Sequence, residues 1–347
     1  MKRNRGWAGW GRWIACGVLA TVGLRGSEPR IEIAWPTPNR AYLEKKPIDA
    51  FIQPTESGEV TSGLFGCVRT SGTQFHEALD LFPLERDRRG EPLDAIFAVM
   101  GGVVRHINPV AGASSYGRYV VIEHVDTVPS IYTLYAHLSA IADGLKIGDR
   151  VTQTQVIATM GRSAGGYTIP KERAHLHFEM GVMLTERFQS WYDWKRFGSK
   201  NDHGLWNGMN LVGFDPMAFY DAFRERRVDN FRDFFRAQEA AVTVRVATTR
   251  VPDFVTRYPS LMTTLLPPGQ VAGWDVKFNA TGLPFAWTPL TKEEIGAQRT
   301  DTAQVVAVDE AAVKACRCKD LVKWRGSKAE TDRDMNTLLQ LLFGLRK

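Results

Sequence analysis

Five residues of this 347-residue chain could assemble a metal-dependent hydrolytic site: His76, Asp80, His137, His175 and His177. Two imidazoles and one carboxylate can fill three corners of a zinc tetrahedron. The fourth corner is then free for water, as in catalytic rather than structural zinc sites. The two remaining histidines are enough to handle protons around that water. The chain has only seven histidines, so most of them fall in this set.

His175 and His177 are two residues apart in a run that is typical of a β-strand, His175–Met180. Residues two apart in a strand face the same side, so the spacing predicts that the two imidazoles project together. Taken alone the pattern is a weak signal, because two surface histidines on an amphipathic strand would show the same spacing.

Asp80 lies in the apolar segment 78–82. A carboxylate in such a setting needs a partner, because burying an unpaired charge is expensive. A metal is one such partner. A salt bridge to an arginine is another, and without the histidines it would be the simpler explanation.

His137 lies in the strand-like run Ile131–Leu138, in which alternation places Thr133, Tyr135 and His137 on one face. A lone histidine in such a strand is more often structural than catalytic. The same structural interpretation applies to His106, His124 and His203, although His124 ends a predicted strand from which it could support the site.

The five candidate site residues lie in a strand-like stretch of sequence from Thr61 to about Met183. Short β-branched and aromatic runs are separated by glycines: Ala95–Val99, Gly102–Ile107, Tyr119–His124, Ile131–His137, Val156–Met160 and His175–Met180. Residues 125–130 separate two strongly β runs and predict a hairpin connection. The regular turn spacing favours a mainly β domain with an antiparallel β-sheet core over βαβ units.

Other segments differ in composition. Residues 27–60 contain five prolines and predict an extended lead-in, and residues 184–213 predict a long insertion loop with short helical pieces. Loops of this length are often functional, and either segment could line or cover the groove.

A helix is expected from Asp215, its N-cap, and Pro216, with an amphipathic pattern running to Ala241. Residues 223–347 predict a C-terminal α/β extension without assignable chemistry. Its strand-like runs are Val242–Ala247 and Val305–Val308, and a terminal helix is expected near 332–345.

Residues 1–26 have the layout of a secretory leader: a basic start without acids, then an apolar run shorter than the ~20 residues that span a bilayer. An uncleaved N-terminal membrane anchor is the competing interpretation. Five of the 44 Lys and Arg residues and none of the 38 Asp and Glu residues lie there, so the remainder is nearly neutral. Without a polybasic tract, nucleic-acid binding has no support.

Cys67, Cys316 and Cys318 follow the leader. In an exported protein Cys67 could be bridged to Cys316 or to Cys318, and unpaired buried thiols are an equal alternative.

The combination of segments resembles the lysostaphin/LytM-type zinc endopeptidases, which cut peptide cross-bridges of bacterial peptidoglycan. Their pattern is His-x3-Asp, then Tyr-x-His-Leu, then His-x-His, matched here at residues 76–80, 135–138 and 175–177. The intervening text at 98–103, 116–124 and 145–161 is also similar. The resemblance covers roughly residues 60–222 and implies a fold of the duplicated-hybrid-motif type for a domain at 61–222.

By position, the resemblance makes His76, Asp80 and His177 the ligands of one Zn²⁺ per chain, and His137 and His175 the catalytic pair. One departure is Ala78, where the family usually has glycine. The implied protein is an exported hydrolase of the periplasm, cell envelope or extracellular space that acts on peptidoglycan peptides.

Two other functions compete with this one. A non-catalytic scaffold of the same fold could bind peptidoglycan or activate another hydrolase, but such relatives are expected to lose metal ligands, and this chain keeps all five positions. An iron oxygenase with two histidines and one carboxylate shares the ligand set, but it leaves His137, His175 and the leader unexplained.

Overall fold

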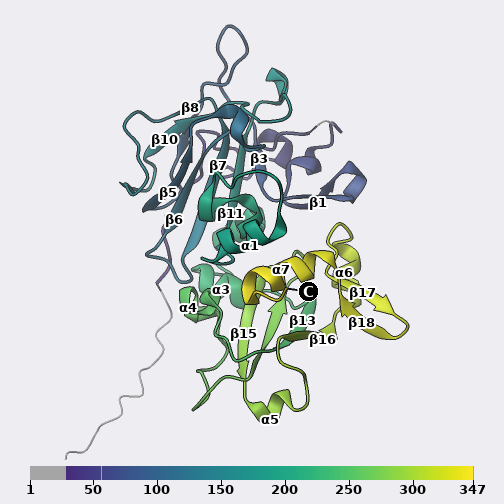
Figure 1. Cartoon of the computed structure of the whole chain (residues 1–347). Helices are drawn as coiled ribbons and strands as arrows, with labels where there is room; N and C mark the ends of the chain where they lie inside the picture. Colours follow the sequence, from purple (N-terminus) through teal and green to yellow (C-terminus); the bar gives the residue numbers. More distant parts are fainter. Residues whose placement is uncertain (1–28, 56, 347) are drawn as a thin grey trace, which may run out of the picture.

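The computed structural model describes residues 29–55 and 57–346, so the expected leader or anchor lies outside the described residues. Antiparallel sheets dominate, as predicted, and the chain folds into an N-terminal β-rich part and a C-terminal α/β part (Figure 1). No helix in the described part of the chain is long and apolar enough to cross a membrane.

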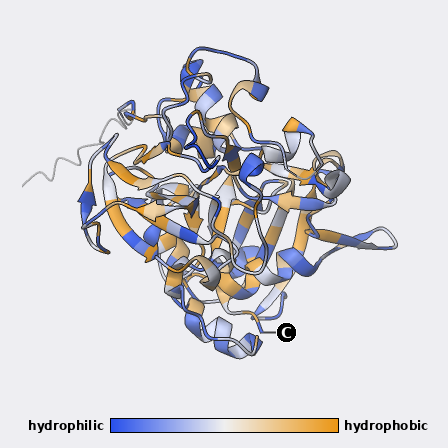
Figure 2. Cartoon of the chain, turned by 90° about the horizontal axis from the view of Figure 1, so that it is seen from above, coloured by the Kyte–Doolittle hydropathy of each residue, from blue (hydrophilic) through white to orange (hydrophobic). Residues whose placement is uncertain are grey.

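The principal sheet of the N-terminal part has the strand order β12-β11-β7-β6-β5-β9, and β3 also pairs with β11. Apolar residues gather along the strands and polar residues along the loops (Figure 2). The strands are β3 (Leu79–Leu81), β5 (Gly102–Asn108), β6 (Arg118–His124), β7 (Ile131–Leu138), β9 (Arg150–Val151), β11 (Leu176–Met183) and β12 (Leu211–Phe214).

Both faces of this sheet are covered, and every residue of β7 and β11 is buried. On one face, Val120 and Ile122 pack in a core with Ile96 and Ile157 from the small sheet β4 (Ala95–Phe97), β10 (Val156–Thr159) and β8 (Ala140–Ile141). On the other face, Tyr132 and its neighbours pack with Trp206 from the 184–213 segment. That segment contains α1 (Phe188–Lys195) and two short 3-10 helices.

The helix expected at Asp215 begins there, but it is shorter than predicted. The Asp215 carboxylate accepts hydrogen bonds from the backbone N–H groups of Met217 and Ala218, and α2 runs over Pro216–Arg224. The prediction of one helix to Ala241 is wrong, because Arg226 has φ 58°, a left-handed conformation that ends a right-handed helix. Asn230 then caps a separate helix, α3 (Phe231–Arg236).

The C-terminal part is built on the sheet β15-β14-β13-β16, and α7 lies between this sheet and the N-terminal part (Figure 1). Trp287 on β15 packs against Phe254 of α4 and Phe343 of α7. The elements are β13 (Val242–Ala247), α4 (Asp253–Arg257), β14 (Gly273–Phe278), β15 (Pro284–Leu290), α5 (Lys292–Ile295), β16 (Thr302–Val308), α6 (Glu310–Ala315), β17 (Val322–Arg325), β18 (Lys328–Thr331) and α7 (Arg333–Phe343).

A disulfide joins the two parts. Cys67, on the two-stranded ribbon β1 (Gly66–Arg69) and β2 (Gln74–His76), is bonded to Cys318, which lies 251 residues further along the chain. Of the alternatives left open by the sequence, the bridge to Cys318 is therefore the one formed, and Cys316 is a buried free thiol.

Candidate metal centre

Three strands bring His76, Asp80 and His177 together. His76 ends β2, and the antiparallel pairing of β3 with β11 sets Asp80 directly opposite His177. His76 Nε2 lies 3.1 Å from Asp80 Oδ1, His177 Nδ1 lies 3.3 Å from the same oxygen, and the two nitrogens are 3.4 Å apart. All three side chains are buried.

This triangle fits a zinc ion. Ligands at about 2.0–2.1 Å in a tetrahedron lie about 3.3 Å from one another, which is the spacing of these three atoms. Asp80 Oδ1 is also buried and accepts no hydrogen bond from any described residue. A buried acceptor without a donor is costly, and a cation at the centre of the triangle would satisfy it.

The outer nitrogens of both histidines have acceptors that hold the rings in place. His76 Nδ1 lies 2.8 Å from the Leu64 carbonyl oxygen, and His177 Nε2 lies 2.9 Å from Glu179 Oε1. With these outer nitrogens held by acceptors, His76 Nε2 and His177 Nδ1 both face Asp80. Metal-binding histidines are commonly oriented in this way.

Arg69 holds the other oxygen of Asp80. Its Nη2 donates to Asp80 Oδ2 at 2.5 Å, and its Nε donates to the Ser62 carbonyl oxygen at 3.4 Å. Burial alone would raise the pKa of Asp80, but the neighbouring His175 and His76 outweigh it and hold that pKa well below the usual range. The carboxylate is therefore ionised at neutral pH.

His137 and His175 lie beside the triangle, with ring centroids 4.8 Å apart. Each ring holds its Nδ1 against a backbone carbonyl oxygen, that of Ser163 at 2.8 Å for His137 and that of Arg173 at 2.6 Å for His175. Burial is the main cause that lowers the pKa of both imidazoles. Both are therefore neutral at pH 7, with Nδ1 protonated and Nε2 able to accept a proton.

His137 reaches the site through a break in the strand alternation. Ala136 pairs with His177 and Tyr135 pairs with Phe178, so a regular strand would turn His137 towards the Phe178 side. His137 instead has φ 60°, and the pairing of β6 with β7 shifts register between Arg118 and Val120. The prediction that His137 shares a face with Tyr135 is therefore wrong. A bulge of this kind re-aims a side chain next to an active site.

A cavity of about 570 Å³ opens onto the two catalytic candidates. Its lining includes His137, His175, Arg69 and Arg173, together with hydroxyl and amide side chains. The lead-in contributes residues 54, 55 and 57, whereas no residue of the 184–213 segment lines it. The cavity therefore presents polar side chains and the two cationic groups of Arg69 and Arg173.

The remaining histidines lie outside the triangle. His124 Nδ1 donates to the Gly101 carbonyl oxygen at 2.9 Å, and its Nε2 lies 2.8 Å from Thr133 Oγ1. The His106 ring lies against the Tyr119 ring at a tilt, with centroids 5.0 Å apart, and contacts His203. None of these contacts reaches the metal ligands.

Comparison with known proteins agrees with the geometry. Residues 75–187 match the model of peptidase family M23. This stretch, about a third of the chain, is similar to peptidase family M23. The match includes all five site positions of the sequence pattern. No curated protein matches the chain.

Solved structures that are similar to part of this chain include the catalytic domains of two proteins. The catalytic domain of the M23 protein EnpA from Enterococcus faecalis is 21% identical to this chain, with a TM-score of 0.26. The matched region covers 38% of this chain and 79% of the EnpA chain. The catalytic domain of lysostaphin from Staphylococcus simulans is 19% identical to this chain, with a TM-score of 0.30. The matched region covers 50% of this chain and 95% of the lysostaphin chain.

A zinc-containing peptidase from Vibrio cholerae is 27% identical, with a TM-score of 0.27. The matched region covers 38% of this chain and 33% of the Vibrio cholerae chain.

Three residues that contact the site residues were not assigned from the sequence. Arg69 and Ser163 are far from their partners along the chain, and no spacing rule connects them. Glu179 is two residues from His177 on the same strand, so strand periodicity alone could have indicated it.

Ala78 stands where the family pattern usually has glycine. It is fully buried between β2 and β3 and is not among the residues with positive φ. The backbone of this chain therefore does not require glycine at position 78.

Proposed function

We propose that this chain is an exported, zinc-dependent endopeptidase that hydrolyses peptide bonds in bacterial peptidoglycan cross-links. Residues 61–222 would form its catalytic domain. The observation that carries the proposal is the triangle of His76, Asp80 and His177, with neutral His137 and His175 on its open side. The M23 match and the peptidoglycan-hydrolase sequence pattern support the substrate class.

The donor set suits zinc, with His76, Asp80 and His177 as its ligands. When bound, zinc lowers the pKa of a coordinated water to about 7 and polarises a carbonyl group. His137 and His175 each present an unprotonated Nε2. Either ring can accept a proton at Nε2 and deliver it to the departing amine, and a positioned group of this kind contributes ~10²–10⁴-fold.

Two further observations support the location and the substrate. A disulfide between Cys67 and Cys318 is favoured in an oxidising compartment outside the cytoplasm. The cavity beside His137 carries Arg69 and Arg173, which suit a peptide with a free carboxylate.

The test is digestion of purified peptidoglycan, with products identified by mass spectrometry. We expect zinc-dependent peptide products from the wild type and a loss of about 10²-fold or more in His137→Ala. His203→Asn is the matched control, because His203 lies outside the site, and it should keep wild-type yield. Binding of peptidoglycan without any product would favour the non-catalytic scaffold instead.

A further inference from the structure

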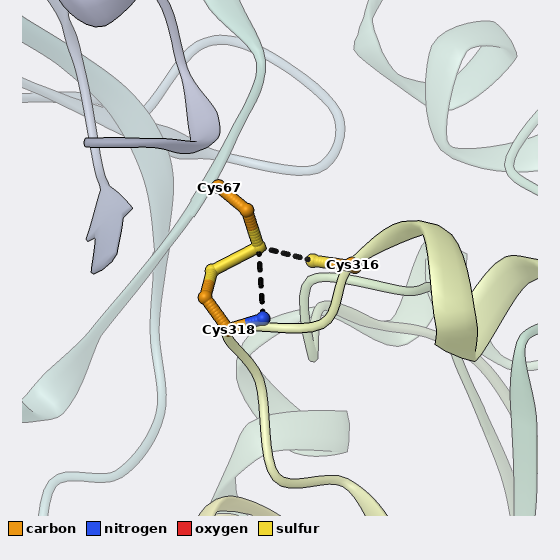
Figure 3. A group of neighbouring side chains, drawn as sticks. All are labelled: Cys67, Cys316 and Cys318. Atoms are coloured by element: carbon orange, nitrogen blue, oxygen red, sulfur yellow. Dashed lines mark hydrogen bonds between the residues drawn. A yellow bond between two sulfur atoms is a disulfide. The ribbon is translucent and has the colours of Figure 1, made fainter. Parts of the chain in front are cut away.

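Three sulfur atoms meet where the C-terminal part reaches the metal-site ribbon (Figure 3). Cys67 Sγ is bonded to Cys318 Sγ, and Cys316 Sγ lies 3.3 Å from Cys67 Sγ. The backbone N–H of Cys318 also donates to Cys67 Sγ at 3.3 Å. Cys316 is a free thiol and is buried.

The arrangement suits displacement at Cys67. Figure 3 shows Cys316 Sγ on the side of Cys67 Sγ that faces away from Cys318 Sγ. Thiol–disulfide exchange proceeds by attack of a thiolate on one sulfur and departure of the other. An incoming sulfur placed opposite the leaving sulfur is the geometry that such a displacement requires.

The same segment holds the ribbon that carries the metal site. Arg317 donates to the backbone oxygens of Ser71 and Gly72 in the β1–β2 turn. Lys319 Nζ lies 3.8 Å from the centre of the Phe75 ring, and Phe75 pairs with Cys67 across the ribbon. The ribbon also carries Arg69 and His76, which contact Asp80.

We propose that Cys67, Cys316 and Cys318 form a three-sulfur exchange site in which Cys67 is bridged to either partner. Through this bridge, residues 316–319 set the position of the β1–β2 ribbon. The relevance of that position to catalysis rests on the proposed function. The thiol–disulfide exchange itself does not depend on the proposed function.

The chemistry balances without an external oxidant. The Cys316 thiolate attacks Cys67 Sγ, a Cys67–Cys316 bond forms and the Cys67–Cys318 bond breaks. Cys318 leaves as a thiolate and takes up the proton that Cys316 lost, so one disulfide and one thiol remain. Burial raises the pKa of the Cys316 thiol, with Lys319 acting in the opposite direction. Exchange should therefore quicken as pH rises, because the thiolate is the nucleophile.

Disulfide mapping by mass spectrometry of acid-quenched, non-reduced peptides tests the exchange. We expect Cys318→Ser to form the Cys67–Cys316 bond, and Cys316→Ser to keep only Cys67–Cys318. Wild type held at pH 8.5 should contain both bridged forms. Cys67 and Cys316 left as free thiols in Cys318→Ser, together with a single bridged form in wild type at pH 8.5, would overturn the proposal.

Hydrogen exchange of the 66–76 peptide tests the control of the ribbon, without reference to activity. Loss of the bridge in Cys67→Ser should speed its exchange about tenfold, since regions with fewer restraints open more readily. Cys316→Ser is the matched control and should exchange like wild type. Equal rates in Cys67→Ser and wild type would overturn the positioning role, whatever the outcome of peptidoglycan digestion.

Discussion

Glu179 Oε1 lies 2.9 Å from His177 Nε2, and the other carboxylate oxygen of Glu179 accepts from the Tyr132 hydroxyl at 3.1 Å. Glu179 is buried. Burial alone would lower the pKa of His177, but the neighbouring carboxylates of Asp80 and Glu179 outweigh it and raise the pKa to about 9, so zinc binding at neutral pH would displace a proton from this ring. Glu179 thus fixes the ring and keeps Nδ1 directed at the metal position, where zinc would replace the Nδ1 proton.

Replacing Glu179 should therefore weaken metal binding rather than remove it. We expect Glu179→Gln to lower zinc affinity about 10–100-fold, the usual effect of losing such a supporting partner. Competition with a chromophoric chelator measures it. Glu123→Gln is the matched control: Glu123 is also buried but is paired with Arg105 and Arg257. Equal losses in both variants would argue against a specific role for Glu179.

Arg69 is predicted to support the site through Asp80. Arg69→Met removes the donor to Asp80 Oδ2, and zinc affinity should fall about tenfold or more. Arg173→Met changes another arginine of the same cavity that makes no contact with a metal ligand, and its zinc affinity should stay at the wild-type level. Wild-type zinc affinity in Arg69→Met would show that the ion pair is dispensable.

The strands could be predicted from the sequence because the alternation of residue types and the turn spacing encode them. The five candidate site positions came from the resemblance to a family pattern, since each local signal alone is weak. The predicted runs Tyr119–His124, Ile131–His137 and His175–Met180 fall on β6, β7 and β11. The orientation of His137 could not be predicted, because a bulge in the pairing with the preceding strand, β6, sets it, and the alternation of residue types does not reveal a bulge. The partners of Asp80 and of Cys67 likewise depend on tertiary contacts, over 11 and 251 residues respectively.

His124 makes the stability of the fold depend on pH. Burial lowers its pKa to about 4, against an ordinary value of 6.5. The unfolded chain therefore binds a proton more readily between these values, and stability is complete above pH 6.5 and lost as pH falls towards 4. From pH 7 to pH 5 this one group should cost about 2 kcal/mol.

Urea unfolding of metal-free protein at both pH values tests that expectation. The loss of unfolding free energy from pH 7 to pH 5 should be about 2 kcal/mol smaller in His124→Gln than in wild type. Since the other histidines are unchanged in the variant, the difference isolates His124. The same loss in both proteins would contradict the assignment.

A substitution at position 78 tests whether alanine, in place of the glycine of the family pattern, distorts the metal site. Because Ala78 is buried and has no positive φ, Ala78→Gly should destabilise the fold by about 0.5–1 kcal/mol through added freedom of the unfolded chain. Zinc affinity should not improve. Tighter zinc binding in the glycine variant, measured by chelator competition, would show that Ala78 distorts the site.

The most direct test of the central claim is a zinc titration of the metal-free chain, followed by the release of soluble peptide products from purified peptidoglycan. Activity should be absent without metal, rise with added zinc and saturate at one zinc per chain, because one triangle of ligands binds one ion. Product formation without metal, or no product at any zinc concentration, would contradict the account.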